Sequence, residues 1–302
     1  MFALYHKFKE GEQMLEYKIP PLAFNGNKKN MLKLYREALE DMRCYTTKET
    51  IFYDVFGGSG LLAHETKRQF QNNEVIWNDY DDFQSRLDML EKTEALRLKL
   101  VQIMGKYTFD KNTPLKQETK EQIIELLKNE GEFDYIQLST WLRFSGSYAT
   151  SCENFFKTKE FYNKLNYNKP LNKKDYLKGV IRVQKDYKEL IKEAKERGNF
   201  FFILDPPYIQ TDKAHYSNFF GIAEFLELIA SIKMPFIFFS SAKSEILPFI
   251  DFCKNAENLQ NLQNLQNLHY KKANLNRCLA NKDNSDFIFY EQTRLFSGIR
   301  AE

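Results

Sequence analysis

Short apolar runs rich in β-branched and aromatic residues recur along this chain, and stretches with helical periodicity follow several of them. Five runs predict strands, at 51–56, 74–77, 200–204, 235–240 and 286–290. Uninterrupted apolar strands are typical of a parallel sheet that helices cover on both faces. The alternation therefore predicts an α/β fold with a mostly parallel central sheet and right-handed crossovers.

The stretch from Asp82 to Gly198 interrupts this alternation. It begins with a charged helical segment, and a second helix is expected from Glu118 to Asn129. Connections between elements of a compact domain are usually about 2–6 residues long, so this stretch is too long for a crossover. We predict a discontinuous domain formed by 1–81 and 183–302, and an inserted, mainly helical domain at 82–182.

The strongest chemical signal is Asp205-Pro206-Pro207-Tyr208, which directly follows the strand expected at 200–204. Ligands of open α/β sheets bind at the carboxyl ends of the strands. Two consecutive prolines fix φ and remove two backbone donors, so this loop is stiff and presents acceptors. Asp205 adds a carboxylate acceptor, and Tyr208 adds an aromatic face.

This acceptor pair suits an exocyclic amino group, whose nitrogen lone pair is delocalised into its ring. Hydrogen bonds from the two N–H groups to the Asp205 carboxylate and the Pro206 carbonyl shift the nitrogen toward sp³ geometry. They also stabilise the positive charge that develops there. Tyr208 is expected to stack on the base. The alternative interpretation is a loop that ends a strand and carries a surface aspartate.

The segment from Asp54 to Gly60 (DVFGGSG) forms a second signal, again between an expected strand and a helix. Glycines allow a tight turn and the close approach of a ligand. The third glycine of the dinucleotide fingerprint G-x-G-x-x-G is missing, which favours a ligand without phosphates. A carboxylate of that ligand is expected at the start of the helix.

Two further segments could line the same pocket. Asp79 ends the second apolar run, about 20 residues beyond the glycines, where the acid that binds ribose hydroxyls is usual. Asp81 is the competing candidate, and a helix N-cap is the alternative role for Asp79. The loop Phe24 to Lys29 (FNGNKK) precedes a helical segment at Asn30 to Leu39, and a capped helix is its simpler interpretation.

Positive charge is concentrated between Ser139 and Arg182, where nine cations face three acidic residues. That excess exceeds the net charge of the whole chain, +3. The stretch is either a solvated lysine-rich surface or a surface that faces phosphates.

The four cysteines never form a CxxC pair, and four histidines show no metal-ligand spacing. The chain has no apolar stretch of about 18 residues and no signal-peptide pattern at Met1 to Lys7. We therefore expect no metal, no membrane association and a cytoplasmic location. The repeat from Asn258 to Leu268 is expected to be a surface insertion, because leucines spaced by three cannot stay on one helix face.

In content and order these motifs resemble those of the Dam-type alpha group of DNA N6-adenine methyltransferases. Phe24 to Lys28 is similar to that group's N-terminal cofactor motif, although Phe24 replaces the usual tryptophan. Asp54 to Gly60 is similar to its Asp-Pro-Phe-x-Gly-Ser-Gly motif, with Val55 in place of proline. Asp205 to Tyr208 is the Asp-Pro-Pro-Tyr motif itself. The long insert lies where this group has its target recognition domain.

The resemblance implies a Rossmann-like methyltransferase fold that transfers a methyl group from S-adenosylmethionine to N6 of an adenine flipped out of double-stranded DNA. The implied catalytic residues are Asp205, Pro206, Pro207 and Tyr208. The implied cofactor-binding residues are Phe24, Gly26, Lys28, Asp54, Phe56, Gly57, Gly58, Gly60, Asp79, Asp186 and Asp205. The expected DNA-contacting residues are Arg143, Lys157, Lys159, Lys173, Lys174 and Tyr216.

Three other functions share parts of this pattern. N4-cytosine methyltransferases carry Ser-Pro-Pro-Tyr more often, so Asp205 favours adenine. RNA base methyltransferases can carry Asp-Pro-Pro with an aromatic residue, but the long insert is not typical of them. A catalytically silent DNA-binding protein has no use for the rigid acceptor pair. A cognate restriction endonuclease is a candidate partner.

Overall fold

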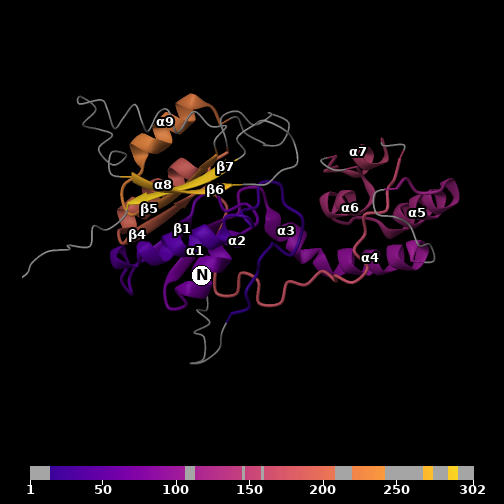
Figure 1. The fold of residues 1–302 in the computed structure, drawn as a ribbon, viewed down its shortest axis with the longest axis horizontal. Helices are drawn as coiled ribbons and strands as arrows, with labels where there is room; N and C mark the ends of the chain where they lie inside the picture. The colour runs from indigo at the N-terminus through magenta and orange to yellow at the C-terminus, as the bar shows by residue number, and fades with distance from the viewer. Residues whose placement is uncertain are drawn as a thin grey trace, which may run out of the picture. The chain divides into compact units, whose positions relative to one another are not determined.

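The computed structural model describes residues 14–105, 113–144, 147–157, 160–207, 220–241, 268–274 and 285–291. The chain divides into two compact units (Figure 1). Unit 1 comprises Met1–Ile19, Asn27–Asp81 and Leu177–Glu302. Unit 2 comprises Pro20–Gly26 and Asp82–Tyr176. Catalytic and target-recognition roles for such units remain proposals.

Within the described residues, unit 1 is built on a seven-stranded sheet in the order β3-β2-β1-β4-β5-β7-β6. The strands are β1 (Ile51–Asp54), β2 (Glu74–Asn78), β3 (Ile181–Val183), β4 (Phe200–Leu204), β5 (Phe236–Ser241), β6 (Leu268–Asn274) and β7 (Ser285–Glu291). The strands β1 to β5 pair in parallel, while β7 runs antiparallel to both β5 and β6. This mostly parallel sheet confirms the predicted Rossmann-like α/β fold.

Helices cover both faces of the sheet, as Figure 1 shows. The helices α1 (Leu32–Asp41) and α2 (Leu61–Gln69) lie on one face. The helices α8 (Tyr187–Arg197) and α9 (Ile222–Ser231) lie on the other, where their apolar side chains pack on alternate residues of β1, β4, β5 and β7. Burying both faces explains why the central strands are apolar without interruption.

Two strands, β3 and β6, are not predicted by the pattern of apolar runs. The strand β3 has only three residues, none of them buried, and a charged residue at its centre. The strand β6 (LHYKKAN) begins where the asparagine–leucine repeat ends and carries two lysines. Neither segment is a continuous apolar run. Apart from Leu268, the repeat itself lies outside the described residues, so its assignment as a surface insertion stays a prediction.

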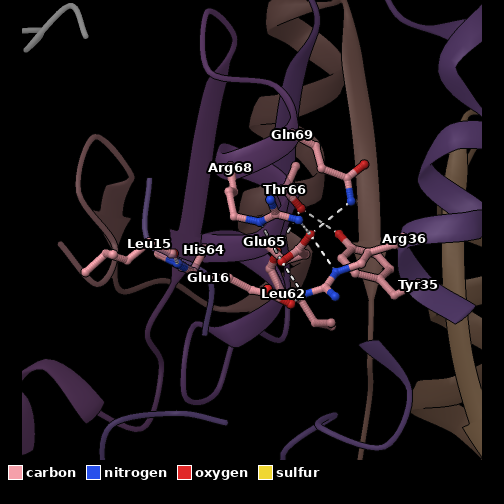
Figure 2. A network of polar contacts seen from close by, with 10 residues as sticks. All are labelled: Leu15, Glu16, Tyr35, Arg36, Leu62, His64, Glu65, Thr66, Arg68 and Gln69. Atoms are coloured by element: carbon pink, nitrogen blue, oxygen red, sulfur yellow. Dashed lines mark hydrogen bonds and ion pairs between the residues drawn. The ribbon is translucent and has the colours of Figure 1, made fainter. Parts of the chain in front are cut away.

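A buried polar network fastens α1 to α2 (Figure 2). The Glu65 side chain is fully buried and accepts hydrogen bonds from Arg36 Nε at 2.9 Å and from Arg68 Nη2 at 2.7 Å. The hydroxyls of Tyr35 and Thr66 lie 2.6 Å apart. The network therefore holds α1 against α2.

Unit 2 has a hydrophobic core of its own, formed by residues such as Leu100, Ile123, Leu138 and Phe155. Its helices are α3 (Phe83–Asp88), α4 (Leu90–Met104), α5 (Gln117–Glu130), α6 (Tyr135–Leu142) and α7 (Cys152–Phe156). The Pro20–Gly26 segment joins this unit through hydrogen bonds of Ala23 with the side chains of Gln137 and Arg86, each 2.7 Å long.

In the part of the chain that the structure describes, each helix is too short or too polar to cross a lipid bilayer.

Candidate active site

The order of strands reverses between β1 and β4, and in open α/β sheets ligands bind outside the carboxyl ends of the strands at such a point. Asp54 is the last residue of β1 and lies in register with Ile203. Asp205 directly follows β4. The two motifs that the sequence singled out are therefore neighbours at one edge of the sheet.

Lys28 and Asp205 form an ion pair at this edge of the sheet. The Lys28 Nζ lies 2.6 Å from Asp205 Oδ2, and the two side chains are only 9% and 14% exposed. The other carboxylate oxygen, Asp205 Oδ1, is buried and has no hydrogen-bond partner among the described residues. Because buried polar atoms are nearly always satisfied, this oxygen marks the place where a ligand would donate a hydrogen bond.

Asp54 is arranged in a similar way. Its Oδ2 atom accepts a hydrogen bond of 3.1 Å from the backbone N–H of Ala63 in the first turn of α2. Its Oδ1 atom is buried without a partner in the described part of the chain. Burial and the nearby Asp205 charge raise the pKa of Asp54 to about 8, while the Ala63 N–H and Lys28 act in the opposite direction.

Burial also raises the pKa of Asp205, against the charge and the hydrogen bond of Lys28, and the Asp286 charge adds to the rise. One lysine thus faces two buried carboxylates. A ligand that brings a positive charge or N–H donors close to them would favour their ionised forms. The arrangement therefore suits a cationic ligand together with an amino group.

The glycine turn between β1 and α2 is shaped by its neighbours in unit 1. A Cβ atom on Gly57 would lie 2.2 Å from Cδ1 of Trp77, and one on Gly60 would lie 2.9 Å from the side chain of Leu177. Gly60 also has a φ of 77°, which favours glycine. Packing inside unit 1 thus accounts for both glycines, and their contact with a cofactor stays a prediction, as does that of Gly58.

Trp77 was not identified from the sequence. Its indole Nε1 is buried and unpartnered within the described ranges. An apolar position in an expected strand gives no signal that a polar atom of this side chain lies beside a glycine turn.

An aromatic cluster lies near the same edge of the sheet. The Phe56 ring lies 5.3 Å from the Tyr187 ring and 6.0 Å from the Phe220 ring. Asp186, the residue before Tyr187, is exposed and caps α8 by accepting a hydrogen bond of 2.9 Å from the Lys188 N–H. The Phe56 ring is tilted by 35° from the Tyr187 ring and stands edge-on to the Phe220 ring, so the cluster offers apolar contacts to a nucleoside base.

Asp79 is fully buried at the end of β2, and its Oδ2 accepts a hydrogen bond of 2.7 Å from Arg182 Nε. The N-cap of α3 is Asp82, so the alternative in which Asp79 caps this helix is wrong. Arg182 was counted in the basic stretch, but the structure places it in β3 beside Asp79. The sequence spacing could not reveal this pair, whose members lie 103 residues apart.

Several predicted residues belong to unit 2. Phe24 packs edge-on against Phe83 with ring centroids 5.6 Å apart, and Gly26 has a φ of 79°. Arg143 is largely buried and donates a hydrogen bond of 3.4 Å to the Asn154 carbonyl. Burial lowers the pKa of Arg143. Since Phe24 and Arg143 both pack inside this unit, roles toward cofactor and DNA stay predictions.

The lysines of unit 2 differ in accessibility. Lys157 and Lys174 are exposed, and Lys157 pairs with Glu153 at 3.0 Å. Lys173 is half-buried and donates a hydrogen bond of 2.6 Å to the Leu87 carbonyl. Tyr208, Lys159 and Tyr216 lie outside the described residues, while Pro206 and Pro207 lie within them.

Two comparisons with known proteins both find similarity to methyltransferases. The family model of D12 class N6 adenine-specific DNA methyltransferases matches residues 24–226. A protein of Haemophilus influenzae named "Putative methyltransferase" is 32% identical over 259 residues, which cover 84% of this chain and 87% of that protein. The matched region runs from the loop before α1 to α9 and so includes Lys28, Asp54 and Asp205.

Proposed function

This chain belongs to the D12 class N6 adenine-specific DNA methyltransferases, and we propose that its Asp205 is the acceptor that activates the adenine amino group. The enzyme methylates adenine in DNA, which sets aside the N4-cytosine, RNA and catalytically silent alternatives. The proposal concerns which residues do this and how.

The observation that carries the proposal is the buried Oδ1 of Asp205, which has no partner in the described ranges and precedes two prolines that stiffen the backbone. An N–H of the adenine amino group donates to this oxygen, and the second N–H donates to the Pro206 carbonyl. Both acceptors are fixed before the substrate arrives, and burial strengthens their effect on the charge that develops on the nitrogen. The aromatic ring of Tyr208 is the proposed stacking partner of the base.

We assign S-adenosylmethionine to the edge of the sheet where β1 and β4 end. When bound, it supplies a methyl group attached to a positively charged sulfur. The Asp54 Oδ1, which has no partner among the described residues, fits such a ligand, because two carboxylates lie near one lysine there. Asp79 is the proposed partner of the ribose hydroxyls, and Phe56 packs against the adenine. We further propose cofactor contacts for Phe24, Gly26, Gly57, Gly58, Gly60 and Asp186, and we assign Asp205 and its ion-pair partner Lys28 to the acceptor instead.

We assign target recognition to unit 2 and double-stranded DNA as the substrate. The exposed Lys157 and Lys174 are proposed to neutralise phosphates, a contact that positions DNA without reading its sequence. The adenine has to leave the helix to reach Asp205, which costs a few kcal/mol of stacking and pairing. A cytoplasmic location and a cognate restriction endonuclease remain part of the proposal.

A product assay tests the assignment. The purified protein is incubated with duplex DNA, with RNA and with S-adenosylmethionine, and the nucleosides are identified by mass spectrometry. We expect N6-methyldeoxyadenosine from DNA only. Methylcytosine, or a methylated base from RNA alone, would contradict the proposed substrate.

A variant of the acceptor tests its role. Asp205→Asn is expected to lower kcat by about 100- to 1,000-fold, as the loss of a comparable polar contact does elsewhere. Cofactor binding should persist. Asp88→Asn, at an aspartate of unit 2 that is 64% exposed, is the control. Transfer by Asp205→Asn within threefold of the wild-type rate would refute the role of Asp205.

A further inference from the structure

The two carboxylate oxygens of Asp205 have different surroundings. Oδ2 receives the Lys28 ammonium at 2.6 Å, and Oδ1 is left buried without a partner in the described ranges. The motif pattern placed Lys28 among the cofactor-binding residues. In the structure its ammonium instead contacts the carboxylate to which we assign the chemistry.

We propose that Lys28 is a positioning residue for methyl transfer, which holds Asp205 Oδ2 so that Oδ1 alone is presented to the target amino group. The inference rests on the proposed function, because it concerns the same acceptor. It adds that the acceptor depends on a specific partner from the loop before α1.

Geometry supports the first part of this role. A carboxylate on its own turns freely about its last side-chain bond, and its two oxygens are equivalent. A charge-assisted hydrogen bond to one oxygen fixes the plane of the group and removes that equivalence. Small errors in the placement of reacting groups lower rates strongly, so a fixed acceptor is worth more than a mobile one. The backbone N–H of Met31 donates a hydrogen bond of 2.8 Å to the Lys28 carbonyl. This bond closes a turn that holds Lys28 itself in place.

Charge supports the second part. Asp54 at the end of β1 and Asp286 on β7 both lie near Asp205, and burial acts with Asp286 to raise its pKa. Lys28 is the positive charge that opposes this rise. A protonated Asp205 is a poorer acceptor for the amine, because its protonated oxygen acts chiefly as a donor. Pairing with Lys28 makes the carboxylate a weaker acceptor, but it lowers the pKa of Asp205 and so favours the ionised form.

Three variants separate this role from a general effect on folding. Lys28→Met removes the charge at nearly constant length, and Lys28→Arg keeps it. Lys67→Met is the matched control, since Lys67 is also buried, 7% exposed, and its Nζ donates to the Asn73 carbonyl at 2.7 Å. Lys28→Met is expected to lower kcat by about 100-fold, with less than a threefold change in the KM for the cofactor.

The pH profile gives a readout that a structural role does not change. In Lys28→Met the acidic limb of kcat should move to higher pH, because the cation that holds the pKa of Asp205 down is gone. Lys28→Arg should restore the limb and part of the rate. Lys67→Met should lower the melting temperature and leave the limb where it is.

A measurement without turnover completes the test. Infrared spectra of the cofactor-free protein record the stretching band of protonated carboxyl groups as pH changes, and Asp205→Asn identifies the contribution of Asp205. That band should persist to higher pH in Lys28→Met. An unchanged Asp205 titration, or a loss of cofactor affinity equal to the loss in kcat, would overturn the inference. If the wild type makes no N6-methyladenine, the proposed function itself fails.

Discussion

Trp77 occupies the space in which a side chain of Gly57 would lie. A Cβ atom on Gly57 would come within 2.2 Å of the indole Cδ1, closer than any two carbon atoms can approach without a bond. The turn that leads from β1 to α2 therefore packs directly on Trp77 of β2, the neighbouring strand. The position of Asp54 depends on this contact, because the same turn separates it from Ala63, its hydrogen-bond donor.

Gly57→Ala should destabilise the protein by about 1–3 kcal/mol, the usual effect of overpacking a dense core. Gly198→Ala is the control, because a Cβ there meets open space and only the φ of 77° is unfavourable. Thermal unfolding measures both. Trp77→Leu should recover part of the loss in the Gly57→Ala background. Equal losses in the two glycine variants would show that the clash with Trp77 is not the cause.

Asp54→Asn should become more stable relative to the wild type as pH rises. The folded-state pKa of Asp54, about 8, lies above its unfolded value of roughly 3.9. The stabilising contribution of protonated Asp54 is complete below pH 4 and is lost as pH rises through 8. The difference between variant and wild type should grow by at most about 1.4 kcal/mol per pH unit and level off above pH 8.

Urea unfolding of the cofactor-free protein at pH 5, 7 and 9 measures this difference. Asp88→Asn, at an exposed aspartate, serves as the control and should follow the wild type. A constant difference between Asp54→Asn and the wild type across this range would contradict a raised pKa.

Glu65→Gln should destabilise unit 1 at neutral pH. Burial alone would raise the pKa of Glu65, but hydrogen bonds from Arg68, Arg36 and Gln69 outweigh it and hold the pKa below its usual value (Figure 2). This contribution is present above about pH 4.3 and is lost as pH falls through the folded-state pKa. We expect a loss of about 2–3 kcal/mol at pH 7, less than for fully buried pairs, because the arginines are 30% exposed.

Urea unfolding at pH 7 and at pH 4 checks the result, and the loss should shrink at the lower pH. Glu40→Gln removes an exposed ion pair with Arg43, 2.8 Å long, and should change stability little. A penalty in Glu65→Gln that does not depend on pH would argue against the ionised form of Glu65.

Lys174→Gln should weaken DNA binding at every sequence and reduce the salt dependence of the affinity by one phosphate contact. Lys173→Gln should reduce it less, since Lys173 is half-buried while Lys174 is exposed. Fluorescence anisotropy with a labelled duplex at several salt concentrations measures both slopes. A Lys174→Gln slope equal to that of the wild type would remove this residue from the DNA-facing surface.

The predicted strands at 200–204 and 286–290 are confirmed as β4 and as the core of β7, because a buried strand has a strong local signature. The edge strand β3 has no such signature, since it is held by pairing with β2 and not by apolar burial. The antiparallel direction of β7 is likewise a property of the whole sheet. Local patterns thus predict the central strands well and the edges poorly.

The candidate active site shows the same difference between features with a local sequence pattern and features that depend on the whole fold. Asp54 and Asp205 could be recognised because each lies at the end of a strand, and the topology brings the ends of β1 and β4 together. The contact of Lys28 with Asp205 and that of Arg182 with Asp79 depend on where distant segments meet. From the sequence, Lys28 was expected to bind the cofactor and Arg182 belonged to the basic stretch. Residues that are far apart in the sequence give no sign that they pair in the fold.

The placement of β3 and β4 after the long insert has a consequence for biosynthesis. Asn78 at the end of β2 donates to the Lys185 carbonyl, 107 residues further along the chain. A ribosome therefore releases β1 and β2 well before their neighbours exist, whereas unit 2 draws most of its core from one continuous stretch and is able to fold first. Newly made β1 and β2 must wait with apolar surface uncovered, so expression at low temperature or with chaperones should raise the yield of active enzyme.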